Sequence, residues 1–296
     1  MSPRISFIGF GEAGHAIAAG LREEGVTQIA AWDILFAQSG GAKLADAAKA
    51  IGVRVASSAE DAVRDTEVVI AAVTAASSYD AAQSVATHLQ GQPFYLDVNS
   101  VSPGRKQATA KLLGDAARYV DVAIVAAIYP ARHKSPMMLA GPDAKAVEPL
   151  LAKLAMRTQI VGDEVGAAAA IKMVRSVMIK GIEALTLECF LAAQRAGVVD
   201  QVAASLKNNY PTLDWNTLSE YNIERMASHG IRRAAEMRQS AETLRELGVE
   251  PLMTAGTIER QQQLGEIGRQ PQVKDAVAKG RDEMLAAISE AVRKTS

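Results

Sequence analysis

A glycine-rich segment near the N-terminus constrains the fold of this 296-residue chain more than any other feature. Its glycines fit the pattern G-x-G-x-x-G, with a predicted strand directly before them and a predicted amphipathic helix directly after. In that context the glycines allow a tight turn, close approach of a pyrophosphate and close packing of helix on sheet. We therefore expect this segment to bind dinucleotide phosphates at the helix N-terminus, the alternative being a turn that binds nothing. The segment consists of Gly9, Phe10, Gly11, Glu12, Ala13 and Gly14.

An acidic residue follows the second predicted strand at the spacing found in dinucleotide-binding folds. Asp33 lies about 20 residues after the glycines, where a carboxylate binds the ribose hydroxyls. A carboxylate there would repel the 2′-phosphate of NADP, and no Lys or Arg follows before Lys43. This pattern favours NAD as the cofactor, with NADP as the alternative. Asp33 could also merely cap a loop.

The first half of the chain alternates between β-rich and helical segments, whereas the second half is helical throughout. Alternation of this kind predicts right-handed crossovers and a mostly parallel sheet. We therefore expect an α/β Rossmann domain at residues 1–163, followed by an all-α domain at residues 164–296. Strands are predicted over residues 5–9, 28–32, 68–73, 94–97, 119–125, 137–139 and 159–161. Helices are predicted over residues 13–24, 43–51, 77–90, 103–113, 166–196, 200–208, 215–228, 231–247, 251–264 and 274–294.

Composition narrows the possible partners. The chain has 32 Lys and Arg against 33 Asp and Glu, so it offers no excess of positive charge for nucleic acid or an anionic membrane. Residues 167–193 are the most hydrophobic long stretch, but they contain five charged residues, which argues against a membrane span. The N-terminus lacks a signal-peptide pattern, so we expect a cytoplasmic protein. The single cysteine, Cys189, is expected in the core, and no residue spacing suggests a metal site.

The first helix of the second half carries an unusual basic face. At 100° per residue, Lys172, Ser176 and Lys180 lie along one side of this helix. The long stems could simply extend to solvent. Alternatively, Lys172 points into a cleft between the domains, where burial and the nearby cations Arg175 or Lys180 lower its pKa. A neutral amine could then accept a hydroxyl proton as a hydride leaves the adjacent carbon.

Three segments resemble the β-hydroxyacid dehydrogenases, the family that includes 6-phosphogluconate dehydrogenase. Residues 9–21 resemble its N-terminal signature, and residues 97–103 resemble the loop that flanks the nicotinamide. Residues 166–172 resemble its G-x-x-x-K catalytic helix, with one extra residue. The resemblance implies a homodimer built around the long Ala-rich helix. It also implies Lys172 as general acid/base, Val73, Thr74 and Asn99 at the cofactor, and Ser100 near the substrate.

The chain departs from this family at two places. The family's Asp-x-Pro-x-Ser-Gly-Gly segment keeps its acid at Asp121 but becomes Val125-Ala126-Ala127 at its end. Ser176 stands where the family has an Asn. Both changes resemble a poorly characterised branch with a phosphogluconate-dehydrogenase-like C-terminal domain. The predicted substrate-binding residues are Ser100, Val125, Arg175, Ser176, His229 and Arg232.

Two basic segments have open interpretations. The loop at residues 132–134 could bind a carboxylate or phosphate, or it could be solvated. His229 is predicted between two helices, where Gly230 makes a turn, with Arg232 in the first turn of the next helix. Cations at that position oppose the helix dipole, so either an anion or an internal pair with Glu236 is expected to compensate.

The combined hypothesis is hydride transfer between NAD(P) and a small anionic hydroxy acid or sugar acid. A second hypothesis is reduction of an imine or a non-acid carbonyl, which the loss of Ser-Gly-Gly favours. A third is dinucleotide binding without catalysis.

Overall fold

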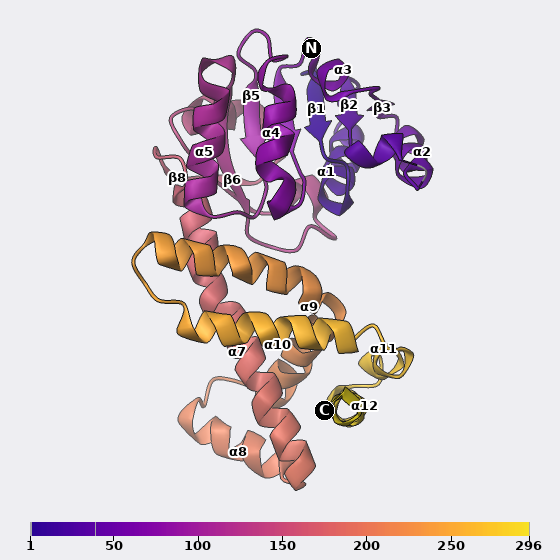
Figure 1. Cartoon of the computed structure of the whole chain (residues 1–296), viewed down its shortest axis with the longest axis vertical. Coiled ribbons are helices and arrows are strands. Elements are labelled where there is room, and N and C mark those ends of the chain that lie inside the picture. Colours follow the sequence, from indigo (N-terminus) through magenta and orange to yellow (C-terminus); the bar gives the residue numbers. More distant parts are fainter. Residues whose placement is uncertain (1, 39, 296) are drawn as a thin grey trace. The chain divides into compact units, whose positions relative to one another are not determined.

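The computed structural model describes residues 2–38 and 40–295 (Figure 1). Contacts along the chain group residues up to Lys172 into one compact unit and residues from Met173 onward into a second. The sequence placed this boundary earlier, between residues 163 and 164. The first residues of helix α7 (Ala167–Ala196) join the first unit because Asp121 accepts the backbone N–H groups of Gly166 and Ala169.

The described part of the first unit contains an eight-stranded sheet of order β3-β2-β1-β4-β5-β6-β7-β8. Every neighbouring pair is parallel except β6 and β7, so the predicted mostly parallel Rossmann-type sheet is confirmed. The short edge strand β3 was not predicted, because two residues are too few to show a period of two. The strands are β1 (Ile5–Ile8), β2 (Ile29–Trp32), β3 (Arg54–Val55), β4 (Val68–Ala71), β5 (Phe94–Asp97), β6 (Arg118–Ile124), β7 (Met137–Ala140) and β8 (Thr158–Gly162).

Helices cover both faces of this sheet. Successive strand residues alternate between two buried clusters, so that Phe7 packs with α1 on one face and Ile8 packs with α4 on the other. Strands buried on both faces read as continuous apolar runs, which is why the central strand β4 was predictable from its sequence. The helices are α1 (Glu12–Glu23), α2 (Ala42–Ala50), α3 (Ala59–Val63), α4 (Ser78–Ala86), α5 (Pro103–Leu113) and α6 (Ala144–Lys153).

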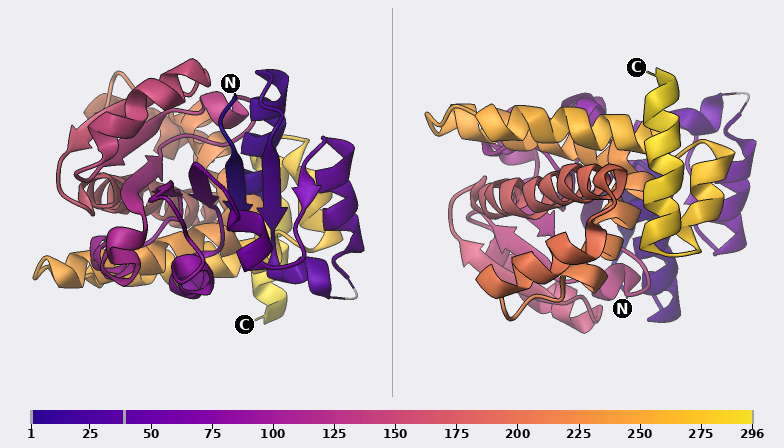
Figure 2. Two further views of the ribbon diagram at one scale, coloured as in Figure 1. Left: turned by 90° about the horizontal axis from the view of Figure 1, so that it is seen from above. Right: turned by 90° about the horizontal axis from the view of Figure 1, so that it is seen from below.

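The second unit is helical, as predicted, and α9 and α10 lie antiparallel beside each other (Figures 1 and 2). The predicted break at Gly230 is wrong, because α9 continues through it. A Cβ on Gly230 would come within 2.6 Å of the Gly265 nitrogen in α10, so this glycine serves a close helix crossing and makes no turn. The helices after α7 are α8 (Val199–Asn209), α9 (Trp215–Glu246), α10 (Leu252–Ile267), α11 (Pro271–Val277) and α12 (Arg281–Thr295).

Two further predictions about the second unit are wrong. The helix expected over residues 274–294 is divided, because Gly280 adopts a φ of +103° between α11 and α12. Cys189 is exposed and does not lie in the core, since it shares a face of α7 with other exposed residues such as Leu185. Among the described residues, no helix has both the length and the hydropathy to cross a bilayer.

Candidate active site

The glycine segment leaves open space directly before the N-terminus of α1. Gly9 has a φ of +90°, and a Cβ there would overlap the Ala72 carbonyl and approach Val73 Cγ1 to 2.5 Å. A Cβ on Gly14 would lie 2.6 Å from the Gly9 oxygen. A Cβ on Gly11, by contrast, would meet no atom within 4 Å. Internal packing therefore accounts for the first and third glycines, whereas the second makes physical sense when a phosphate fills that space.

The other residues of this segment have distinct surroundings. Glu12 and Ala13 form the first turn of α1, whose leading N–H groups have no intrahelical acceptor. The ring of Phe10, expected to contact a cofactor, is fully buried and packs edge-on against Phe7 at 5.9 Å between ring centroids. Phe10 therefore supports the loop from beneath.

Asp33 fastens this loop to the end of β2. Its Oδ2 accepts the N–H of Phe10 at 2.7 Å, and its Oδ1 accepts the N–H of Leu35 at 2.9 Å. Asp33 thus caps the short helix Ile34–Ala37, as the alternative interpretation proposed. Each carboxylate oxygen keeps a further lone pair, so the cap leaves Asp33 able to accept a hydroxyl.

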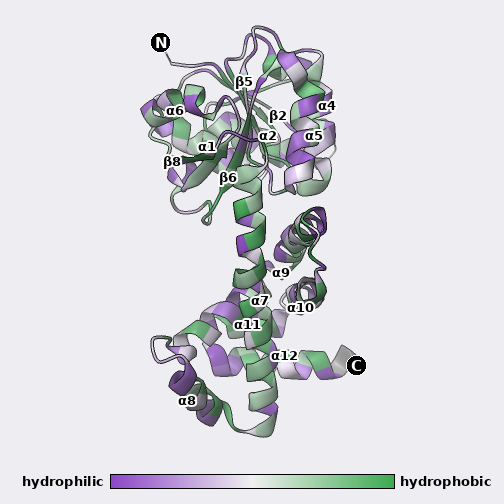
Figure 3. Cartoon of the chain, turned by 90° about the vertical axis from the view of Figure 1, so that its left-hand side faces the viewer, coloured by the Kyte–Doolittle hydropathy of each residue, from purple (hydrophilic) through white to green (hydrophobic). Residues whose placement is uncertain are grey.

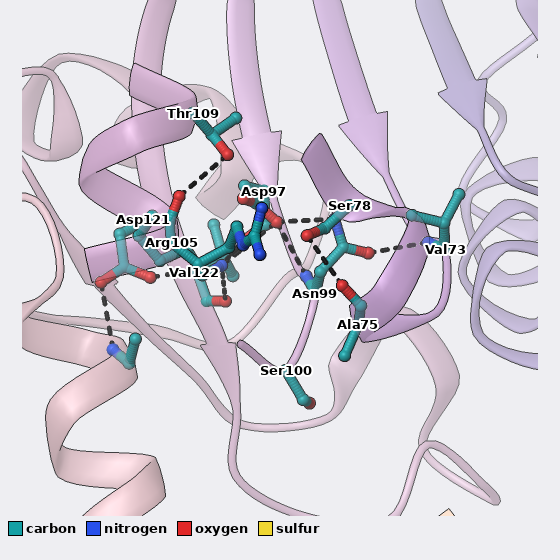
Figure 4. A network of polar contacts seen from close by, with 12 residues as sticks. Val73, Ala75, Ser78, Asp97, Asn99, Ser100, Arg105, Thr109, Asp121 and Val122 are labelled. Carbon is teal, nitrogen blue, oxygen red and sulfur yellow. Dashed lines mark hydrogen bonds and ion pairs between the residues drawn. The ribbon is translucent and has the colours of Figure 1, made fainter. Parts of the chain in front are cut away.

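The loops after β4 and β5 are joined by Asn99. Its Oδ1 accepts the N–H of Val73 at 2.7 Å, and its Nδ2 donates to Asp97 Oδ1 at 2.8 Å (Figure 4). Asn99 is 4% exposed, so it acts by positioning the Val73 backbone beside Gly9. Thr74, which follows, is exposed, and its hydroxyl lies 3.1 Å from the Ser77 hydroxyl.

Lys172 lies against the loop that follows β5. Its Nζ donates to the Ser100 hydroxyl at 2.6 Å, and the lysine is half-buried in the second turn of α7. Ser100 directly follows Asn99 at the carboxyl end of β5, which is the edge where open α/β sheets bind ligands (Figure 4). The predicted acid/base lysine and the predicted nicotinamide loop therefore meet within the first unit.

A buried polar network under this edge was not predicted. Lys106 is fully buried, and its Nζ lies 3.2 Å from Asp97 Oδ1 and 3.4 Å from Asp121 Oδ1. Tyr119 donates to Asp97 Oδ2 at 2.7 Å, and burial followed by the Asp97 charge holds the pKa of that phenol well above its ordinary value. The sequence signal available for this network was the helical spacing of Lys106, Thr109 and Leu113, which are the buried residues of α5.

Val125 offers less to a substrate than the resemblance implied. Its backbone N–H donates to the Pro136 carbonyl at 3.0 Å, so that amide is already engaged. Ala126 and Ala127, which replace the family's glycines, are exposed. The loop that follows β6 therefore lacks the hydroxyl of the family's serine and presents small apolar side chains.

The basic loop at residues 132–134 pairs with helix α1. Arg132 forms an ion pair with Glu23, and Lys134 Nζ lies 2.6 Å from Glu24 Oε1. His133 is 2% exposed and packs over Gly20, where any Cβ would overlap its ring. Burial lowers the pKa of His133, and Glu24 only partly opposes this effect. The expected anion-binding or solvated loop is thus an internal contact.

Four predicted substrate residues belong to the second unit. Arg175 is exposed and Ser176 is buried on α7, while His229 and Arg232 lie in the middle of α9, away from any helix end. The helix-dipole argument for Arg232 is therefore wrong. Burial is the largest cause that lowers the pKa of His229, with Arg225 and Arg232 adding to it.

Glu236, the acidic partner expected for Arg232, also contacts a lysine of α7. Glu236 accepts a hydrogen bond from Lys180 Nζ at 2.7 Å, and burial lowers the pKa of that lysine. Lys180 Nζ also lies 3.5 Å from the Ser176 hydroxyl.

Comparison with known proteins agrees with the division of the chain into two units. Residues 4–100 match the family model "NADP oxidoreductase coenzyme F420-dependent", and residues 193–264 match a domain of unknown function, DUF1932. An uncharacterized 28.5 kDa protein from Methanothermus fervidus is 31% identical over 204 residues, which are 69% of this chain and 76% of that protein.

Two solved structures extend the similarity over nearly the whole chain. A conserved hypothetical protein from Sinorhizobium meliloti is 32% identical, with a TM-score of 0.78 over 98% of this chain and 97% of that one. The 3-hydroxyisobutyrate dehydrogenase of Mycobacterium tuberculosis shares the fold at 18% identity, with a TM-score of 0.73 over 99% of this chain and 100% of that one.

The fold is that of NAD(P)-binding oxidoreductases. The chain belongs to the β-hydroxyacid dehydrogenase and 6-phosphogluconate dehydrogenase-like family, in the branch whose helical half carries the DUF1932 domain.

Proposed function

We propose that this protein transfers a hydride between NAD(P) and a small anionic hydroxy acid or sugar acid, with Lys172 as general acid/base. The observation that carries the proposal is the 2.6 Å contact from Lys172 Nζ to the Ser100 hydroxyl. It holds a primary amine next to Asn99, whose side chain fixes the backbone beside the glycine segment. An amine, a hydroxyl and the uncrowded backbone of Gly11 thus lie at the carboxyl ends of the strands.

The proposed chemistry divides simply between cofactor and protein. The nicotinamide, when bound, supplies the hydride acceptor or donor. Neutral Lys172 removes the hydroxyl proton of the substrate as its carbon loses hydride, and the Lys172 ammonium returns that proton in the reverse direction. Ser100 orients the amine through its hydrogen bond.

We propose NAD as the preferred cofactor, because Asp33 places a carboxylate at the end of β2. Its two hydrogen bonds to Phe10 and Leu35 hold the carboxylate at that position, where its negative charge repels a 2′-phosphate. Fluorescence titrations with NADH and with NADPH test this preference, and tighter binding of NADPH would contradict it.

We propose that cations of the second unit bind the negative charge of the substrate. Arg175 and Arg232 are exposed and His229 is half-exposed, so all three are accessible to small anions, whereas Ser176, the fourth residue assigned to the substrate, is buried. A cytoplasmic location stays a prediction of the sequence.

The second candidate function, reduction of an imine or non-acid carbonyl, has one observation in its favour. Because the Val125 N–H is bonded to Pro136, the loop after β6 offers one donor fewer to a substrate carboxylate. A panel of hydroxy acids, sugar acids, aldehydes and cyclic imines, followed by the absorbance of reduced nicotinamide, separates the two functions. Turnover of imines alone would favour the second.

Substitution of Lys172 tests the mechanism. Lys172→Met should abolish turnover while leaving the Kd for NADH within about threefold of wild type, because the side chain acts on the substrate proton. The matched control is Lys111→Met, at an exposed position on α5 of the same unit, which should retain full activity. Loss of NADH binding in Lys172→Met would show that the lysine is structural, and NADH binding without turnover of any substrate would favour a non-catalytic protein.

We further propose that the protein is a homodimer that packs through one face of α7. Exposed apolar residues recur there every three or four positions, so they share one face of the helix, which we call the α7 stripe. Much of the α7 ribbon has the colour of hydrophobic residues (Figure 3). Such a stripe marks an interaction surface, and a helix face can be self-complementary about a two-fold axis. The α7 stripe consists of Ile171, Val174, Met178, Ile182, Leu185 and Cys189.

A further inference from the structure

The fully buried lysine of helix α5 has no role in the proposed proton transfer. Lys106 is 0% exposed, and its ammonium lies 3.2 Å from Asp97 Oδ1 and 3.4 Å from Asp121 Oδ1. It also donates to the backbone carbonyl of Asp97. Burying a charge is costly unless it is paired, so a lysine at this position needs both carboxylates.

One of these carboxylates leads to the cofactor side of the site. Asp97 Oδ1 accepts both the backbone N–H of Asn99 at 3.0 Å and its side-chain amide at 2.8 Å. These two bonds orient Asn99 so that its Oδ1 receives the Val73 N–H at 2.7 Å. Val73 in turn packs over Gly9, where only a glycine fits.

The other carboxylate leads to the catalytic helix. Asp121 Oδ2 accepts the N–H groups of Gly166 at 3.1 Å and Ala169 at 3.0 Å, at the start of α7. This negative charge also suits the positive end of the helix dipole. Lys172 follows Ala169 by less than one helical turn. Asp121 therefore fixes the position of the backbone that carries the Lys172 side chain.

The second oxygen of Asp121 depends on the lysine. Asp121 Oδ1 is buried and accepts no hydrogen bond from the described residues, and it faces the Lys106 ammonium as its ion-pair partner. Without the lysine, two carboxylates would lie close together in the core, each repelling the other. The two side chains would then move apart, and each would carry its hydrogen-bonded backbone with it.

We infer that Lys106 is a positioning residue that aligns the cofactor loop and the catalytic helix through two separate arms. The first arm is Asp97–Asn99–Val73, and the second is Asp121 with the first turn of α7. The arms meet again where Lys172 donates to Ser100. This inference rests on the proposed function, because that function assigns the first arm to cofactor binding and the second arm to proton transfer.

Three single variants test the two arms without any knowledge of the substrate. The first readout is the Kd for NADH from fluorescence titration. The second is the apparent pKa of Lys172, obtained from the pH dependence of its acetylation by acetic anhydride and read by peptide mass spectrometry. Exposed Lys111 in the same digest serves as the internal control.

Asp97→Asn should raise the Kd for NADH about tenfold, because Asn99 loses a charged acceptor, and should leave the Lys172 profile unchanged. Asp121→Asn should change the apparent pKa of Lys172 obtained from its acetylation and leave the Kd for NADH unchanged. Lys106→Met should change both readouts, and Lys111 should be unaffected in every variant.

The outcomes separate this inference from the proposed function. If Lys106→Met folds and changes neither readout, or if each carboxylate variant changes both readouts equally, the two-arm assignment is overturned. If Lys106→Met does not fold, the two carboxylate variants decide alone, since an amide keeps the shape and part of the hydrogen bonding of each acid. Failure of the wild-type protein to bind NADH would refute the proposed function, while the Lys172 profile would still test the second arm.

Discussion

The three glycines before α1 provide a direct test of the cofactor site, because the structure assigns them different roles. Gly11→Ala adds a Cβ that meets no atom within 4 Å. Its backbone, at φ −70° and ψ −158°, is open to alanine. The free energy of unfolding should therefore change by less than about 0.5 kcal/mol.

The same methyl group should nevertheless weaken cofactor binding. It occupies the space through which the backbone approaches a pyrophosphate, so we expect the Kd for NADH to rise at least about tenfold, or about 1.4 kcal/mol. Gly9→Ala should instead lower the free energy of unfolding. Its φ of +90° costs an alanine about 1–3 kcal/mol, and overlap with the Ala72 carbonyl adds about 1–3 kcal/mol.

Urea denaturation and NADH fluorescence titration on the two variants and the wild type measure both effects. Gly9→Ala serves as the matched control, since it makes the same chemical change two residues away. Wild-type affinity for NADH in Gly11→Ala would show that the pyrophosphate does not use this space. A large loss of stability in Gly11→Ala would show instead that the position is already filled by the protein.

Two further predictions concern stability and assembly. Burial lowers the pKa of His133 below its value of about 6.5 in the unfolded chain, so the unfolded state binds more protons and the free energy of unfolding should fall as pH drops below about 6.5. In denaturant melts from about pH 7 to about pH 5, His133→Asn should reduce the slope of the free energy of unfolding against pH. The slope that is left is due to His229, whose pKa is also lowered. An unchanged slope would contradict the assignment to His133. Met178→Glu should convert the proposed dimer to a monomer by light scattering, because it places a charge in the α7 stripe, whereas Ala108→Glu on exposed α5 should not. A wild-type monomer at micromolar concentration would remove the basis for this interface.

Local sequence patterns were sufficient to predict the fold class. The glycine segment lies between β1 and α1 as predicted, since strand, turn and helix each leave their signature within a few residues. The apolar run at residues 68–71 reads as a strand because both of its faces are buried. The change from alternating segments to helices was visible for the same reason, because periodicity is a property of neighbouring residues.

The errors occur where a distant partner decides the outcome. Gly230 reads as a breaker, but its missing side chain admits α10, which lies more than 20 residues further along the chain. The loop at residues 132–134 reads as a free cationic loop, yet its partners Glu23 and Glu24 are about 110 residues away. Cys189 was predicted in the core because its neighbours in the helix are apolar. Sequence periodicity shows which residues share a helix face, but it does not show which element packs against that face.

The sequence by itself determined the Rossmann-type alternation, the glycine segment with its acid at the end of β2, and a lysine on the first helix of the second half. Only the tertiary structure placed Lys172 against Ser100 and buried Lys106 between Asp97 and Asp121. The physical reason is that backbone conformation depends mainly on local side chains, whereas a buried charge depends on partners that folding alone brings within a few ångströms.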